Sequence, residues 1–247
     1  MKAFAKLTAV DVQLYLREPS AAFFTIAFAP MLLVLFGLIY GNTPQAAFGG
    51  RGTVDVSVPA YLGVIIVTVG LISIPIGTAI ERERGILRRY RATPLRPLSY
   101  IGADVLTYFL MTSLGALLLV AIGKVVYNIR FEGDPASVLL AFALGSLAFF
   151  AAGYVLGGIA PNGRVAQTAG MILAYPMMFL SGSTVPLENL PENVRQLASF
   201  LPLTHVVTLM RGVWAGDALG AHGTELVVLG LLLVIGTAIS ARVFRWD

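Results

Sequence analysis

The sequence contains no cysteine and only two histidines, and just 12% of its 247 residues are charged. Without cysteine the chain can form no disulfide framework, thiol nucleophile or thiolate metal site. His205 and His222 stand at no metal-ligand spacing, so we expect no metal site. A typical soluble domain carries about 25% charged residues. The low charge and the mean hydropathy of +0.83 therefore indicate an integral membrane protein.

Motifs that could energise transport are also missing. The chain has one Gly-Lys pair, Gly123-Lys124, and Leu118 occupies the position where a phosphate-binding loop needs its first glycine. No carboxylate or histidine lies inside the apolar runs, where ion-coupled carriers place them. Asp104 and Glu225 lie at the ends of such runs, where dipole-stabilising or interfacial roles are commoner. An ion-coupled secondary transporter that uses one of these two carboxylates is the alternative function.

Enzymatic chemistry within the membrane is a third possibility, and we expect no catalytic residue on this chain. Ser73, Ser113 and Ser146 lie in apolar runs without a nearby histidine or aspartate to activate them. An intramembrane enzyme is therefore a poor description of the sequence.

Charge-free apolar runs recur along the whole chain, and a helix of about 20 residues crosses the hydrocarbon core of a membrane. We predict an all-α membrane protein with one transmembrane domain over residues 1–247. Its six transmembrane helices are expected at about residues 21–40, 58–80, 102–123, 136–160, 165–180 and 226–241. Pro59 falls near the start of the second span, and Pro75 is expected to bend that span near its end.

Two segments outside the spans also have helical patterns. Residues 1–18 are predicted to form an amphipathic helix on the membrane surface, with a solvated lead-in as the alternative. Residues 183–214 contain two apolar helical stretches that are interrupted by Pro202, and the second is too short to span. They predict a re-entrant helical hairpin on the external face.

The basic residues decide the expected orientation. With both termini cytoplasmic, twelve of the 17 basic residues lie inside and five lie outside, as the positive-inside rule requires. Six of the twelve are arginines in the loop of residues 81–97, which follows the second span. This distribution reports topology, so no nucleic-acid partner is expected.

The loop of residues 81–97 also has the pattern of a short amphipathic helix. Gly85 would end the helix that leaves the second span, and Pro94 and Pro97 would end the loop's own helix. Its apolar ridge with a basic rim would fit a groove on a partly acidic soluble partner. The alternative is a polybasic loop that fixes orientation and touches anionic membrane lipid.

Two motifs make the pattern more specific. AIERERGILRRYRATPL at residues 79–95 resembles the cytoplasmic signature of the type-2 ATP-binding-cassette (ABC) exporter permeases, which follows their second span. LSGSTVPLENLP at 180–191, LPLT at 201–204 and LMRG at 209–212 look like the external hairpin of the same family. The resemblance covers the full length and is closest to the drug and antibiotic resistance branch, the daunorubicin-resistance-like membrane proteins.

That resemblance implies a permease subunit in a bacterial plasma membrane, without a cofactor of its own. Its partners would be two cytoplasmic ABC ATPase subunits, which carry ATP and magnesium, and a second permease half, identical or different. The substrate would be a small hydrophobic or amphipathic molecule, such as a drug, antibiotic or lipid, moved outward. The residues implied at the ATPase contact are Glu81, Glu83, Gly85, Leu87, Arg88, Tyr90, Arg91, Thr93 and Pro94.

The first and fifth spans are expected to face the second permease half and to enclose the substrate path. The candidates for that path on the fifth span are Gln167, Thr168, Tyr175, Met177, Met178 and Phe179. Thioether and aromatic side chains adapt to varied ligands. Ordinary packing or lipid contact is the alternative for these apolar side chains, and hydrogen bonding between helices is the alternative for the two polar ones.

Overall fold

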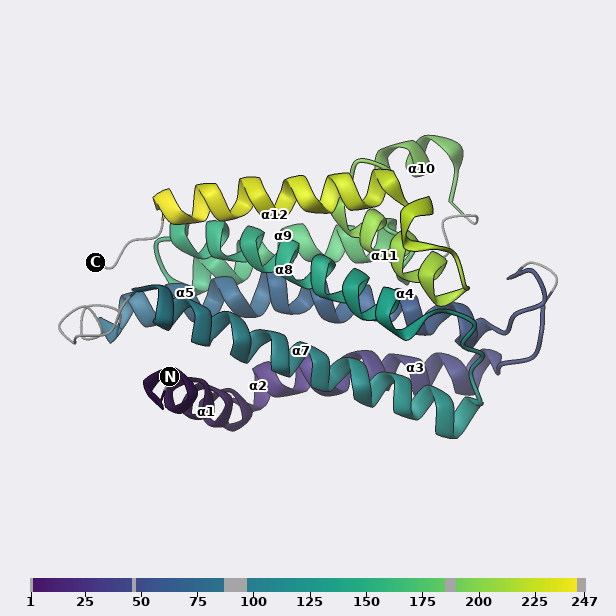
Figure 1. Cartoon of the computed structure of the whole chain (residues 1–247), viewed down its shortest axis with the longest axis horizontal. Helices are drawn as coiled ribbons and strands as arrows, with labels where there is room; N and C mark the ends of the chain where they lie inside the picture. The colour runs from purple at the N-terminus through teal and green to yellow at the C-terminus, as the bar shows by residue number, and fades with distance from the viewer. Residues whose placement is uncertain (1, 46–47, 87–96, 185–189, 244–247) are drawn as a thin grey trace.

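The computed structural model describes residues 2–45, 48–86, 97–184 and 190–243, and every secondary-structure element named in them is a helix (Figure 1). The elements are α1 (Lys2–Arg17), α2 (Pro19–Ala22), the π-helix η1 (Phe23–Ala27), α3 (Phe28–Tyr40), α4 (Thr53–Thr68), the π-helix η3 (Val69–Ser73), α5 (Ile74–Glu83), α7 (Pro97–Tyr127), α8 (Pro135–Ile159), α9 (Gly163–Leu180), α10 (Glu192–Ala198), α11 (Pro202–Trp214), the 3-10 helix η5 (Leu219–Ala221) and α12 (Gly223–Val243). The predicted all-α fold class is confirmed for this part of the chain.

Five helical segments are long and apolar enough to cross a membrane. They are Pro19–Tyr40, Thr53–Glu83, Tyr100–Tyr127, Pro135–Ile159 and Gly223–Val243. They coincide with five of the six predicted spans and extend most of them by a few residues. The second span is the most changed, because it begins at Thr53 and so encloses Pro59 within α4.

The remaining predicted span forms helix α9, which is not among those five. Arg164, Gln167 and Pro176 make its sequence more polar than the others. Its 18 residues extend about 27 Å along the helix axis. The helix runs beside the second span, with Gly163 against Ile80 and Gly170 against the backbone of η3.

The helices connect two opposite ends of the molecule (Figure 1). The terminal end holds α1, the last turn of α5, the α8–α9 turn and the last turn of α12. The hairpin end holds residues 41–45 and 48–52, the 128–134 connection and the pair α10 and α11. Both ends of the described chain therefore lie on one side, as the predicted topology requires.

Helix α4 forms the centre of the bundle, and every residue from Val58 to Thr68 is buried. Helices α3, α7, α8, α9 and α11 surround it. Helix α11 packs a mainly apolar face into this core, where the side chains of Leu203 and Val207 lie against Gly63. The second half of the predicted hairpin is thus packed into the bundle.

A π-turn precedes a proline in each of the first two spans. In η3 the N–H of Ile74 bonds the carbonyl of Val69, five residues back. Pro75 has no N–H to give to the carbonyl of Leu71, which an ordinary helix would require. A widened turn therefore lies just before Pro75, the residue at which the sequence predicts a bend.

Glycines of neighbouring helices lie directly on the carbonyls of these π-turns. A Cβ on Gly153 of α8 would overlap the carbonyl oxygen of Gly70, and one on Gly170 of α9 would overlap that of Leu71. Gly115 of α7 has the same relation to the carbonyl of Thr25 in η1. Small residues permit such close backbone approach between membrane helices.

The start of α8 provides a test of local stability. The Asp134 carboxylate accepts hydrogen bonds from the backbone N–H and the hydroxyl of Ser137, both at 2.8 Å, and these bonds lower the pKa of the carboxyl. Because the pKa of this carboxyl is lower in the folded state, its ionised form stabilises the fold at pH values above the ordinary aspartate pKa. This contribution is lost as the pH falls through the lowered pKa of the folded state. We expect Asp134→Ala to lower the unfolding temperature by about 2 °C at pH 7.

Thermal unfolding in detergent at neutral and strongly acidic pH measures this effect. Asp134→Ser, which keeps a capping oxygen without a charge, is the control and should lose less than the alanine variant. A deficit of Asp134→Ala that is the same at both pH values would contradict the assignment.

Candidate functional site

The last turn of α5 is bound to the C-terminus of α8 through Arg82. Its guanidinium donates hydrogen bonds to the carbonyls of Gly157 at 3.3 Å, of Gly158 at 2.9 Å and of Ala160. The last carbonyls of a helix lack partners within the helix and carry partial negative charge. A cation held there satisfies several of them together.

Glu83, one residue further on, is bound to the N-terminus of α9. Its Oε2 atom accepts from the backbone N–H of Gly163 at 3.3 Å. Asn162 caps the same helix by accepting from the N–H of Val165 at 2.9 Å. Arg82 thus holds the end of α8, and Glu83 holds the start of α9. We call these two side chains together with residues 157–163 the clasp.

Two tyrosine–carboxylate hydrogen bonds join the same region to α7 and α8. The Tyr100 hydroxyl donates to Glu81 in α5, and the Tyr154 hydroxyl donates to Oδ2 of Asp104 at 2.7 Å. Asp104 is half-buried, and it is one of the two carboxylates, with Glu225, that the alternative ion-coupled function could use. The Glu-Arg-Glu sequence at the end of α5 thus contacts α7, α8 and α9.

Helix α1 is attached to the bundle at the terminal end. The hydroxyls of Tyr15 and Thr25 share a hydrogen bond of 2.6 Å, and Thr25 is fully buried within η1. The Tyr15 ring also meets the Tyr108 ring edge-on at 5.7 Å. Burial raises the pKa of the Asp11 carboxyl on the same helix. This amphipathic helix is therefore held by specific contacts with the first and third spans.

The structure describes three of the residues expected at the ATPase contact. Glu81 and Glu83 have the intramolecular partners given above, and Gly85 has a φ of +67° that ends the helix as predicted. A positive φ favours glycine there. The others lie outside the described residues: Leu87, Arg88, Tyr90, Arg91, Thr93 and Pro94.

The path candidates on α9 divide between two environments. The exposed candidates are Gln167, Thr168, Tyr175 and Phe179. Met177 is half-buried, whereas Met178 is 6% exposed and belongs to the hydrophobic core. The Thr168 hydroxyl donates to the carbonyl of Arg164 at 3.0 Å, within its own helix. Four of the six candidates therefore share the outer face of α9.

A buried carboxylate at the hairpin end was not anticipated from the sequence. Asp55 is 4% exposed, and it accepts from the N–H groups of Gly52 at 3.0 Å and Arg130 at 2.9 Å. Asn42 donates to Asp55 at 3.0 Å and to the carbonyl of Tyr127 at 3.1 Å. These bonds tie together the starts and ends of three helices. No motif pairs Asn42 with Asp55, so only the fold reveals this network.

The described part of the chain brings no three metal-ligating side chains together. Nothing in its geometry defines a hydrolytic centre either: the candidate site is a set of contacts between spans at the terminal end. The hydrogen bonds of this site hold the ends of α5, α8 and α9 together.

Comparison with known proteins identifies the class. The sequence profile of ABC-2 family transporter proteins matches residues 42–242. This chain belongs to that family. Together with five apolar helices of spanning length, the match establishes a multi-pass membrane protein.

Three relatives show the range of similarity. The daunorubicin resistance ABC transporter permease protein DrrB1 of Streptomyces coeruleorubidus is 26% identical over 258 residues, 98% of this chain and 88% of that protein. Nodulation protein J of Rhizobium leguminosarum bv. viciae is 31% identical over 103 residues, 42% of this chain. The probable multidrug ABC transporter permease YbhR of Escherichia coli K12 is 23% identical over 161 residues, 65% of this chain. The matches cover 40% and 44% of the last two proteins, so this chain spans less than half of their lengths.

Proposed function

We propose that this chain is the membrane permease subunit of an ATP-driven exporter, energised by separate ATPase subunits. The observation that carries the proposal is the clasp. The loop of residues 81–97, here called the arginine-rich segment, begins in the last turn of α5. That turn is bound to α8 by Arg82, to α9 by Glu83 and to α7 by Glu81. A partner that moves this segment would therefore move three spans together.

The proposed topology has six spans, with α9 as the fifth and with the terminal end in the cytoplasm of a bacterial cell. Helix α1 would lie on the cytoplasmic membrane surface, and α10 and α11 would form the external hairpin. The distribution of basic residues supports this orientation, and so does the position of α1 and the last turn of α12 at the same end of the molecule. The family of the chain supports an ABC ATPase subunit as partner. The proposed complex has two such subunits, carrying ATP and magnesium, and a second permease half.

The six sequence-derived contact residues from Leu87 to Pro94 would then meet the ATPase. Glu81 and Glu83 would act inside the permease and transmit that contact to the other spans. This division of labour follows from their partners within the chain.

The proposed substrate is a small hydrophobic or amphipathic molecule that passes along the outer face of α9. Tyr175 and Phe179 offer apolar contact there, while Gln167 and Thr168 add polar groups nearer the terminal end. The outer faces of α3 and α9 would meet the second permease half around this path. The relative DrrB1 is named for daunorubicin resistance, which supports a drug or antibiotic as substrate.

ATP hydrolysis in proteoliposomes tests the proposal. We expect the permease to raise or regulate hydrolysis by the ATPase encoded beside it, and the triple reversal Arg88→Glu, Arg89→Glu and Arg91→Glu to abolish this effect without preventing membrane insertion. Arg195→Glu at the hairpin end is the matched control and should leave the effect intact. Hydrolysis that is indifferent to folded permease would reject the proposal. Transport without ATPase that collapses with an ion gradient would instead favour a carrier centred on Asp104.

A further inference from the structure

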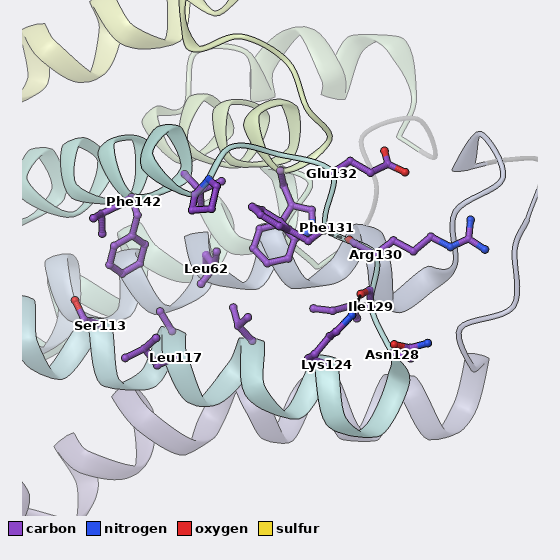
Figure 2. A pocket seen from close by; sticks show the side chains of 16 residues that line it. Leu62, Ser113, Leu117, Lys124, Asn128, Ile129, Arg130, Phe131, Glu132 and Phe142 are labelled. Carbon is purple, nitrogen blue, oxygen red and sulfur yellow. Dashed lines mark hydrogen bonds between the residues drawn. The ribbon is translucent and has the colours of Figure 1, made fainter.

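A hollow of about 1020 Å³ opens between α7 and α8 at the hairpin end (Figure 2). Leu62 of α4 lies at its base, Leu117 and Val120 of α7 form one wall, and Leu139 and Phe142 of α8 form the other. The volume matches that of small-molecule sites. We call this hollow the α7–α8 groove. It lies on other helices than the outer face of α9, so it is separate from the proposed substrate path.

The two ends of the groove differ in chemistry. Toward the middle of the bundle its labelled side chains are Leu117 and Phe142, with the single hydroxyl of Ser113, whereas Lys124 and Arg130 lie at the hairpin end (Figure 2). The apolar walls continue onto open surface, because Leu117 is 67% exposed and Leu139 is 61% exposed. In a membrane protein such leucines face acyl chains.

The charge at the hairpin end of the groove is positive. Glu132 is paired with Arg51 at 2.8 Å and so offers no free negative charge. Lys124 donates one long hydrogen bond of 3.5 Å to the carbonyl of Ile129, and the Arg130 guanidinium donates one of 3.4 Å to the carbonyl of Gly50. Within the described ranges neither cation has a carboxylate partner. Lys124 thus lies at the hairpin end of the apolar groove, and the Arg130 guanidinium extends from the same end toward Gly50.

We propose that the α7–α8 groove binds an anionic phospholipid of the surrounding leaflet. One acyl chain lies between α7 and α8, and the phosphate lies against Lys124 and Arg130. The apolar wall alone would not distinguish a bound chain from bulk lipid, since both environments are hydrocarbon. Selection therefore comes from the headgroup, at roughly five-fold per basic side chain.

Trp214 reports occupancy of the groove. Trp214 lines the groove, and its ring packs edge-to-face against that of Phe131 with ring centres 4.8 Å apart. Its Nε1–H donates a hydrogen bond to the carbonyl of Arg130 at 3.1 Å. The sequence has two tryptophans, and Trp246→Phe leaves Trp214 alone. The probes are phosphatidylglycerol and phosphatidylcholine, each brominated near the headgroup end of the acyl chain, because bromine quenches tryptophan fluorescence on contact.

In vesicles of equal brominated fraction, we expect phosphatidylglycerol to quench Trp214 at several-fold lower mole fraction than phosphatidylcholine. Lys124→Gln combined with Arg130→Gln should remove that preference and leave weak, equal quenching. Arg195→Gln removes one positive charge at the same end but outside the groove; it is the control for a general loss of charge and should keep the preference.

Three results would overturn the proposal. Equal quenching by both lipids in the parent protein would mean ordinary lipid contact. Absence of quenching by either lipid would mean that no acyl chain lies in the groove beside Trp214. A preference that survives loss of both cations would assign selection elsewhere. None of these measurements requires ATPase or transport, so they do not depend on the proposed function.

Discussion

Replacing Gly153 by alanine is expected to lower the free energy of unfolding by about 3 kcal/mol, the upper end of the cost of overpacking a core. The new Cβ would overlap the carbonyl oxygen of Gly70, which is backbone and cannot rotate away. Gly170→Ala should cost a similar amount, since its Cβ would overlap the carbonyl of Leu71 one residue further along η3. Each variant must separate a helix from the second span.

The position of this contact makes the expected loss large. In the π-turn of η3 the N–H of Ile74 bonds the carbonyl of Val69 instead of that of Gly70. Pro75 has no N–H for the carbonyl of Leu71. Gly153 of α8 and Gly170 of α9 approach those carbonyls from two neighbouring helices. A weak point in the second span is therefore also the place where two other spans pack most closely.

Denaturant titration in detergent, followed by circular dichroism, measures the two losses. Gly230→Ala in α12 is the matched control, because it is a helical glycine whose added Cβ would meet nothing within 4 Å. We expect that control to be neutral or slightly stabilising. Gly153→Ala or Gly170→Ala with unchanged stability would show that α8 and α9 do not approach the π-turn so closely.

Apolar runs were sufficient to predict most of the helices, because hydrocarbon requires every spanning backbone group to bond within its own helix. The glycine at position 85 likewise predicted where the helix ends. The sequence did not predict π-turns, because a proline indicates a disturbed helix but not that the turn before it widens. The length of α11 predicted a re-entrant helix, but it could not show that this helix packs against α4.

Side-chain roles at the candidate site were less predictable than the helices. The charge of residues 81–97 predicted a cytoplasmic loop, yet it did not distinguish one arginine in that loop from another. In the structure Arg82 is bound to carbonyls of α8, while the neighbouring Arg84 is exposed. The two arginines differ because Arg82 lies on the side of α5 that packs against α8, whereas Arg84 lies on the exposed side. The sequence alone does not show which side of α5 other helices cover.

Arg82→Ala is expected to weaken the clasp by about 2 kcal/mol, the usual worth of hydrogen bonds from a charged donor. That loss would raise the population of a detached α8–α9 turn roughly 30-fold. Amide hydrogen exchange should therefore quicken by a similar factor at Gly163, whose N–H is held by Glu83. Arg82→Lys should give an intermediate effect, because an ammonium cannot span three carbonyls as a guanidinium does.

The same substitution separates structure from coupling. Arg84→Ala is the matched control, since it removes an exposed arginine of the same turn that forms no ion pair with the described residues, and it should leave exchange at Gly163 unchanged. If Arg82→Ala also lowers the permease's stimulation of ATP hydrolysis while insertion and helix content persist, the clasp carries movement from the arginine-rich segment to α8 and α9. Faster exchange with full stimulation would leave the clasp as a purely structural contact. Unchanged exchange would mean that Glu83 and Asn162 hold the turn without Arg82.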